Sequence, residues 1–125
     1  MAYSFKDIKA WQKSYELVLL VYQATRHFPD FEKYGLASQF QRTAVSIIAN
    51  IAEGSKKLSK ADKLRFMNIA QGSLEECRCY IMLSKDLQYV KENEYEILEN
   101  HVNNASFLLN AYCKAIVENK GVHDE

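Results

Sequence analysis

Glycine and proline are scarce in this sequence, with four glycines and one proline among 125 residues. A β-sandwich or β-barrel of this length needs many tight turns, and tight turns depend on these two residues. Their scarcity therefore favours long helices joined by a few short connections. The length fits a single domain, which we expect to span residues 1–125.

Long apolar runs are also missing. No stretch of about 18 apolar residues occurs, which argues against a membrane span. The opening residues MAYSFKD lack the apolar core of a signal peptide. Three cysteines are an odd number, which argues against a disulfide framework. We therefore expect a cytoplasmic protein with reduced thiols and no membrane contact.

Signatures of catalysis and metal binding are missing as well. Cys77 and Cys79 lie two apart, on different sides of a helix, and no histidine groups with them, so a zinc site is not predicted. The sequence has neither the Glu-x-x-His pairs of a di-iron bundle nor a glycine-rich phosphate loop. We expect no enzymatic activity, cofactor, metal or small-molecule substrate. Cys77 and Cys113 are interpreted as small core residues.

Apolar residues recur at alternating steps of three and four, which predicts amphipathic helices. The first is expected to run from its N-cap Asp7 to His27, ahead of a stop at Phe28-Pro29. Its expected core face is Ile8, Trp11, Tyr15, Val18 and Tyr22. The second is expected to run from Leu36 to a left-handed cap at Gly54. Its expected core face is Phe40, Ala44, Ile47 and Ile51.

Two longer helices are expected to follow. Residues 59–62 resemble a capping box that opens the third helix, which should end at about Tyr89. Its core face is Met67, Ala70, Leu74, Cys77, Ile81 and Ser84. The fourth should fray near Lys120-Gly121, with a core face of Tyr95, Leu98, Val102, Ala105, Leu109, Tyr112 and Ile116. Because short connections make successive helices antiparallel, the predicted fold is all-α, an antiparallel up-down-up-down four-helix bundle.

The first two helices carry more apolar surface than one bundle needs. The additional residues are Leu17, Leu19, Leu20 and Val21 in the first helix and Val45, Ile47, Ile48 and Ile51 in the second. A helix that is apolar nearly all round is usually buried on more than one side. We therefore expect a homo-oligomer.

Four segments resemble one known family. Residues 46–54 read SIIANIAEG, and the family of four-helix bundle proteins encoded in 23S rRNA intervening sequences has S-I-P-A-N-I-A-E-G in its second helix. FKDI at 5–8 followed by WQK at 11–13, the first loop from Phe28-Pro29 to YGL at 34–36, and AQGSLEE at 70–76 resemble further family motifs. The resemblance covers the chain from about Tyr3 to Glu118.

The resemblance implies a four-helix bundle without enzymatic activity, similar to the accessory protein of diversity-generating retroelements. It also implies a ring-like homopentamer, with a suggested role in binding nucleic acid. One position departs from the family pattern, because Ile48 stands where proline is usual. Proline removes a backbone donor and bends a helix, so Ile48 should leave this helix straighter.

Two pairs within these motifs are candidate site residues. Asn50 and Glu53 share a helix face, where they could contact a ligand or nucleic acid. We favour a buried polar network that fixes the register or caps a helix end, with Arg42 or Lys56 beside Glu53. Gly72 and Ser73 fall in mid-helix, where glycine costs about 1 kcal/mol relative to alanine. Close approach of Ala49 and Ala52 is expected to offset that cost.

Charge is balanced overall but unevenly distributed. Residues 1–65 hold 11 basic and 6 acidic side chains, a net of +5, and residues 66–125 hold 5 and 10, a net of −5. Five cations cluster in residues 55–65 with one aspartate: Lys56, Lys57, Lys60, Lys63 and Arg65. A ring of subunits would repeat this basic end and strengthen contacts to a phosphate backbone. Solubilising charge is the alternative. Phe66, the one nearby aromatic residue, is expected to face the core, so base-specific recognition is not predicted.

The sequence thus favours a non-enzymatic oligomeric helical scaffold, with a basic end that is a candidate for binding RNA or DNA without sequence preference. The alternative is a protein-interaction adaptor whose basic end meets an acidic or nucleic-acid-processing partner. The third hypothesis, and the least favoured, is an enzyme with a site between subunits.

Overall fold

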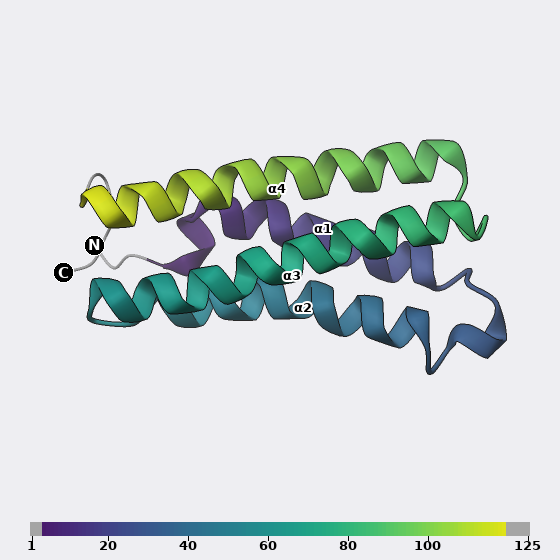
Figure 1. The fold of residues 1–125 in the computed structure, drawn as a ribbon, viewed down its shortest axis with the longest axis horizontal. Coiled ribbons are helices and arrows are strands. Elements are labelled where there is room, and N and C mark those ends of the chain that lie inside the picture. The colour runs from purple at the N-terminus through teal and green to yellow at the C-terminus, as the bar shows by residue number, and fades with distance from the viewer. Residues whose placement is uncertain (1–3, 120–125) are drawn as a thin grey trace.

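Four long helices make up most of the part of the chain that the structure describes (Figure 1). The structure, a computed structural model, describes residues 4–119. The helices are α1 (Lys9–Thr25), α2 (Leu36–Ser55), α3 (Lys60–Asp86) and α4 (Glu92–Glu118), with 3-10 turns η1 (Phe5–Asp7) and η2 (Asp30–Glu32). Strands are absent from the described residues, which confirms the all-α prediction. Within that range no helix is long and apolar enough to cross a membrane.

The helices form an antiparallel bundle in which each packs along two others. α1 packs against α2 and α4, and α3 packs against the same two helices. The diagonal pairs, α1 with α3 and α2 with α4, are not neighbours. The start of α1, the α2–α3 connection and the end of α4 therefore lie at one end of the bundle, with η2 and the α3–α4 connection at the other (Figure 1).

The core faces of α2, α3 and α4 follow the predicted spacing. Every residue predicted for the core in α2 and α3 is buried, and α2 runs unbroken through Ile48. In α4, five of the seven predicted residues are buried, namely Leu98, Val102, Ala105, Leu109 and Ile116. Tyr95 and Tyr112 are half-buried at the edge of the core. Strict 3-4 spacing was therefore a sufficient signal in these helices.

The core face of α1 was predicted correctly at Ile8 and Val18, which are buried, but wrongly at Tyr15 and Tyr22. Tyr15 and Tyr22 are 43% and 42% exposed, whereas Leu17 and Val21 are fully buried. The set that contains Tyr15 and Tyr22 and the set that contains Leu17 and Val21 both have helical spacing, because α1 carries apolar side chains around much of its circumference. The large tyrosine rings, with a polar end, suit a half-exposed position.

The predicted N-cap residue is wrong for α1 and confirmed for α3. Asp7 does not cap α1, because its Oδ2 accepts a hydrogen bond from Ser4 N at 3.3 Å within η1. The N-cap position of α1 is Ile8 instead. Ser59 caps α3 as expected, and its Oγ accepts from Asp62 N at 3.1 Å. The predicted fraying near Lys120-Gly121 lies outside the described residues.

Both glycines for which the sequence suggested a role differ from the prediction. Gly54 is not a left-handed cap but a buried residue inside α2, where a Cβ would lie 2.7 Å from Phe66 Cβ and 2.8 Å from Met67 Cε. Its missing side chain lets α3 approach α2 closely. Gly72 is exposed, and nothing lies within 4 Å of a Cβ placed there. The expected contact with Ala49 and Ala52 was therefore wrong.

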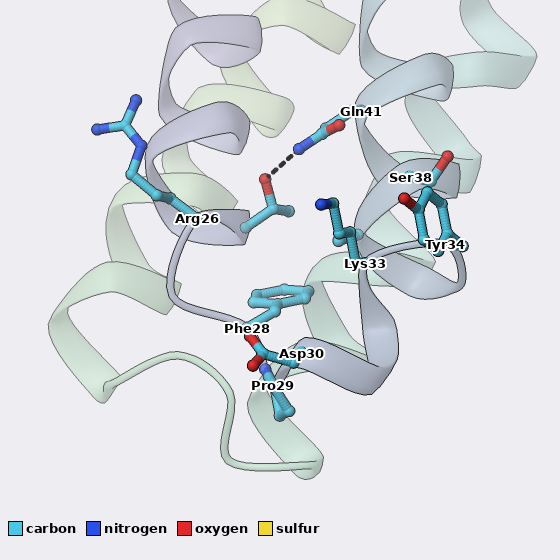
Figure 2. A pocket seen from close by; sticks show the side chains of 10 residues that line it. Arg26, Phe28, Pro29, Asp30, Lys33, Tyr34, Ser38 and Gln41 are labelled. Carbon is cyan, nitrogen blue, oxygen red and sulfur yellow. Dashed lines mark hydrogen bonds between the residues drawn. The ribbon is translucent and has the colours of Figure 1, made fainter.

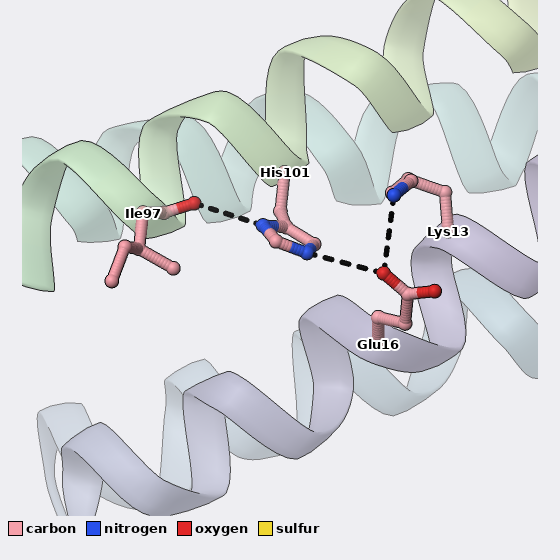
Figure 3. A network of polar contacts seen from close by, with 4 residues as sticks. All are labelled: Lys13, Glu16, Ile97 and His101. Carbon is pink, nitrogen blue, oxygen red and sulfur yellow. Dashed lines mark hydrogen bonds and ion pairs between the residues drawn. The ribbon is translucent and has the colours of Figure 1, made fainter.

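A polar network links α1 to α4 (Figure 3). Glu16 Oε1 accepts a hydrogen bond from Lys13 Nζ at 3.1 Å and lies 3.2 Å from His101 Nε2. His101 Nδ1 lies 3.0 Å from the carbonyl oxygen of Ile97. The hydrogen bond from Lys13 holds the pKa of Glu16 below its ordinary value. Exposed pairs of this kind add little stability, but this one shows which side of α1 faces α4.

Candidate functional site

The opposite side of α1 faces α2, and apolar residues flank that contact. Gln41 Nε2 donates a hydrogen bond to Thr25 Oγ1 at 2.9 Å, so these two residues mark the facing sides of α1 and α2. Tyr22 precedes Thr25 by three residues and lies on the same side of α1. Val45 and Ile48 follow Gln41 by four and seven residues and lie on the same side of α2.

An apolar face therefore covers the outer side of α1 and α2. We define it as Trp11, Tyr15, Leu19, Tyr22, Val45, Ile48, Ala49 and Ala52. Leu19 is 49% exposed and Val45 is 37% exposed, and the Trp11 and Tyr15 rings stack with centroids 5.0 Å apart. α1 has no charged residue after Glu16, and α2 has none between Arg42 and Glu53. Exposed apolar surface without charge is typical of the centre of a protein interface.

The basic end holds fewer accessible cations than the sequence predicted. Lys63 is only 2% exposed, and its Nζ donates to the carbonyl oxygen of Ser55 at 3.1 Å. It thereby satisfies a backbone acceptor at the C-terminus of α2, where the helix dipole favours positive charge. Lys63 is therefore unavailable to a polyanion, which corrects its assignment to the binding set. Sequence spacing gives no signal for this contact, because it depends on how α3 packs over the end of α2.

Lys60 has a similar role at the end of α4. Its Nζ donates to the carbonyl oxygen of Val117 at 3.1 Å, which joins the start of α3 to the last turn of α4. Lys60 remains exposed, so it can still meet a ligand if it gives up this bond.

Two of the other three cations, Lys57 and Arg65, lie beside the ring of Phe66. Lys57 Nζ lies 4.9 Å and Arg65 Cζ 4.6 Å from the centroid of the Phe66 ring, which is half-buried and not fully in the core as expected. Lys57 Nζ also lies 3.9 Å from Glu53 Oε2, and Arg65 Nε lies 4.0 Å from Asp62 Oδ1. Lys56 is exposed and has no ion pair in the described structure. The accessible set is thus Lys56, Lys57, Lys60 and Arg65.

Comparison with known proteins places this bundle in a family. The model of the 23S rRNA-intervening sequence protein family matches residues 6–111. The chain belongs to this family. A crystal structure of a protein with unknown function from the S23 ribosomal protein family of Bacteroides thetaiotaomicron superposes with a TM-score of 0.78 at 24% identity, covering 84% of this chain and 98% of that chain. At this identity the likeness shows the fold alone. No curated protein matches.

The segment that resembles the family motif, residues 46–54, contributes to a polar network between α2 and α3. Asn50 Nδ2 donates to the carbonyl oxygen of Ser46 at 2.8 Å and lies 3.0 Å from Ser46 Oγ. Ser46 Oγ lies 3.1 Å from Oγ of buried Ser73. The structure therefore brings Asn50 and Ser73 together through Ser46, which the sequence analysis had not singled out. The i, i+4 spacing of Ser46 and Asn50 could have indicated it.

Glu53 does not join this network. Its side chain is exposed, and the nearest cation is Lys57, not Arg42 or Lys56 as expected. Gly72 likewise points to open space beside Ser73. Of the motif residues, Asn50, Ser73 and Gly54 are thus explained by packing of α2 on α3, whereas Glu53 and Gly72 are surface residues.

Two cysteines in the described range have a raised pKa. Burial, together with the nearby charge of Glu76, raises the pKa of the Cys77 thiol to about 12. Burial also raises the pKa of Cys113, which is half-buried. Residues 4–119 contain no group of three His, Cys, Asp or Glu side chains that could hold a metal ion.

Thiol labelling is expected to separate the three cysteines. At about pH 8 the exposed Cys79 should react with a disulfide reagent first, and buried Cys77 should react about a thousandfold more slowly, because the thiolate is the reactive form. Mass spectrometry of the labelled peptides measures both rates, and Cys79→Ser should abolish the fast phase. Fast labelling of Cys77 in the folded protein would contradict the packing of α3.

Proposed function

We propose that this protein is a non-enzymatic helical scaffold that self-associates through the apolar face of α1 and α2. The supporting observation is the set of half-exposed apolar side chains, led by Tyr15, Leu19 and Tyr22, on a surface without charge. Burying such a surface releases about 25 cal/mol for each Å² of apolar area removed from water. Self-association is the simplest way to bury it, since every copy presents the same face.

Sedimentation velocity tests the assembly directly. At micromolar concentration the protein should sediment as a multiple of its 14.5 kDa chain mass. The homopentamer implied by the family resemblance has five times 14.5 kDa, about 73 kDa. A folded species of 14.5 kDa at that concentration would overturn the proposal.

A second candidate function is sequence-independent binding of RNA or DNA at the basic end. The observation that favours it is the placement of four accessible cations, Lys56, Lys57, Lys60 and Arg65, around one end of the bundle. Repetition around an assembly would multiply weak phosphate contacts. An acidic partner protein at the same end is the alternative.

A salt titration distinguishes phosphate contacts from other binding. Each chain that contacts single-stranded RNA through four cations should contribute about −2.8 to the slope of the logarithm of the affinity against the logarithm of salt concentration. Lys56→Gln should reduce the slope by about 0.7 for each such chain. Lys91→Gln, an exposed lysine at the opposite end, should leave it unchanged and serves as the control. Absence of RNA binding at low salt, with retained binding to polyglutamate, would instead favour the adaptor.

A further inference from the structure

A pocket lies at the end of the bundle opposite to the basic end (Figure 2). It is bounded by the last residues of α1, the turn η2 and the first residues of α2. Its volume of about 460 Å³ falls within the range of small-molecule sites in proteins. None of its lining residues belongs to the apolar face, so its occupancy does not depend on self-association.

The apolar wall of the pocket is fixed by the core. Phe28 is 7% exposed, and its ring packs on Tyr89 with centroids 5.0 Å apart. Ala37, at the start of α2, is also buried. These residues expose only a small area, but it is a firm apolar base for a ligand because their positions are set by packing rather than by the ligand.

Glu32 holds the adjoining turn in place. Its Oε1 accepts from Leu36 N at 3.0 Å, and its Oε2 accepts from Tyr89 Oη at 2.9 Å. Both carboxylate oxygens of Glu32 therefore hold the turn, one on α2 and one on the side chain of Tyr89. The same bonds fix the backbone that carries Lys33.

The charged residues of the pocket favour an anion. Lys33 directs its ammonium into the space between α1 and α2 (Figure 2), where Nζ lies 5.5 Å from the centroid of the Tyr34 ring, and no ion pair holds it in the described structure. Arg26 stands at the rim, also without an ion pair, with its guanidinium directed away from the pocket. Asp30 is the one acidic residue in the lining, which leaves a net charge of +1 there.

We propose that this pocket binds a small organic anion. The carboxylate or phosphate of the ligand accepts a hydrogen bond from Lys33, and its apolar body lies against Phe28 and Ala37. A charge-assisted bond in a partly enclosed site is stronger than one at an open surface. Arg26 adds attraction from the rim. Inorganic anions fit less well because they leave the apolar wall uncovered.

Amide NMR titrations with four probes test the proposal: phenyl phosphate, benzoate, inorganic phosphate and benzyl alcohol. At least one of the two aryl anions should shift the amides of Gln41, Ala37 and Thr25 in a saturable way, with a dissociation constant of about 1 mM or lower. It should bind at least about fivefold more tightly than inorganic phosphate and benzyl alcohol. Comparison of the two aryl anions shows whether the site prefers phosphate or carboxylate. Failure of both aryl anions to meet these criteria overturns the proposal.

Variants of exposed residues locate the site without disturbing the fold. Lys33→Gln should weaken binding of the aryl anion about tenfold, and Lys33→Arg should restore most of it. Arg42→Gln removes an exposed cation from α2 outside the pocket and should leave the affinity unchanged. Equal affinities in the Lys33→Gln variant and the unmodified protein would show that the anion binds elsewhere, and the assignment would fail.

Discussion

Replacement of Leu19 by glutamate is expected to convert the assembly into a folded monomer of about 14.5 kDa. Leu19 is 49% exposed in the single chain, so a glutamate there remains hydrated and leaves the bundle intact. In the assembly the same carboxylate would be buried against apolar side chains without a partner. That burial costs several kcal/mol, and about 3 kcal/mol already weakens an interface more than a hundredfold. Sedimentation velocity measures the mass, and circular dichroism verifies the helix content.

The matched control for this experiment is Phe107→Glu. Phe107 is 74% exposed on α4, the helix diagonally opposite α2, and it lies outside the apolar face. The substitution adds the same charge and also removes a large apolar side chain, yet the mass should not change. If Phe107→Glu dissociates the assembly and Leu19→Glu does not, the interface lies on α4 and our assignment of the face is wrong.

The substitution of glycine by alanine is expected to have opposite effects at two positions. Gly54→Ala should lower the free energy of unfolding by about 1–3 kcal/mol, because the new Cβ would lie 2.7 Å from Phe66 Cβ and α3 would have to move. Gly72→Ala should raise it by about 1 kcal/mol, because alanine is the better helix former and meets no atom within 4 Å.

Urea unfolding of both variants in the Leu19→Glu background measures these changes without a contribution from association. The two transitions should shift in opposite directions at an unchanged slope. A stabilising Gly54→Ala would mean that α2 and α3 pack less closely than the structure shows. A destabilising Gly72→Ala in the monomer would mean that this part of α3 is not open to solvent.

The core face of a helix could be predicted from the sequence where its apolar spacing allowed only one interpretation. In α3 and α4 the predicted core residues keep an unbroken 3-4 spacing, so their core faces could be predicted although other apolar side chains, such as Met82 and Phe107, are exposed. In α1 two overlapping stripes exist, and only the packing of the other helices decides that Leu17 and Val21 are buried while Tyr15 and Tyr22 are not. The prediction of additional apolar surface was wrong for Leu17, Val21, Ile47 and Ile51, which are buried in the core of the single chain. Leu19, Val45 and Ile48 from the same prediction belong to the apolar face.

Contacts between residues far apart in the chain were beyond prediction from local spacing. Lys63 reads as one of five similar cations, and its burial follows from the angle at which α3 leaves the end of α2. The close approach of α3 was assigned to Gly72 because that glycine lies in mid-helix, whereas Gly54, near a helix end, resembled a cap. The pocket beside Lys33 has no sequence motif, since its walls come from α1, η2 and α2 together.

Because Lys63 is buried, added salt should affect the binding of a polyanion and the contact between α2 and α3 differently. At 0.1 M salt, mobile ions largely screen the attraction between exposed charges more than about 10 Å apart, but they reach a buried ammonium poorly. The bond from Lys63 to the Ser55 carbonyl should therefore persist in concentrated salt. A bound polyanion would then dissociate on addition of salt while the junction between α2 and α3 stays closed, so elution by salt should return the protein in its native shape.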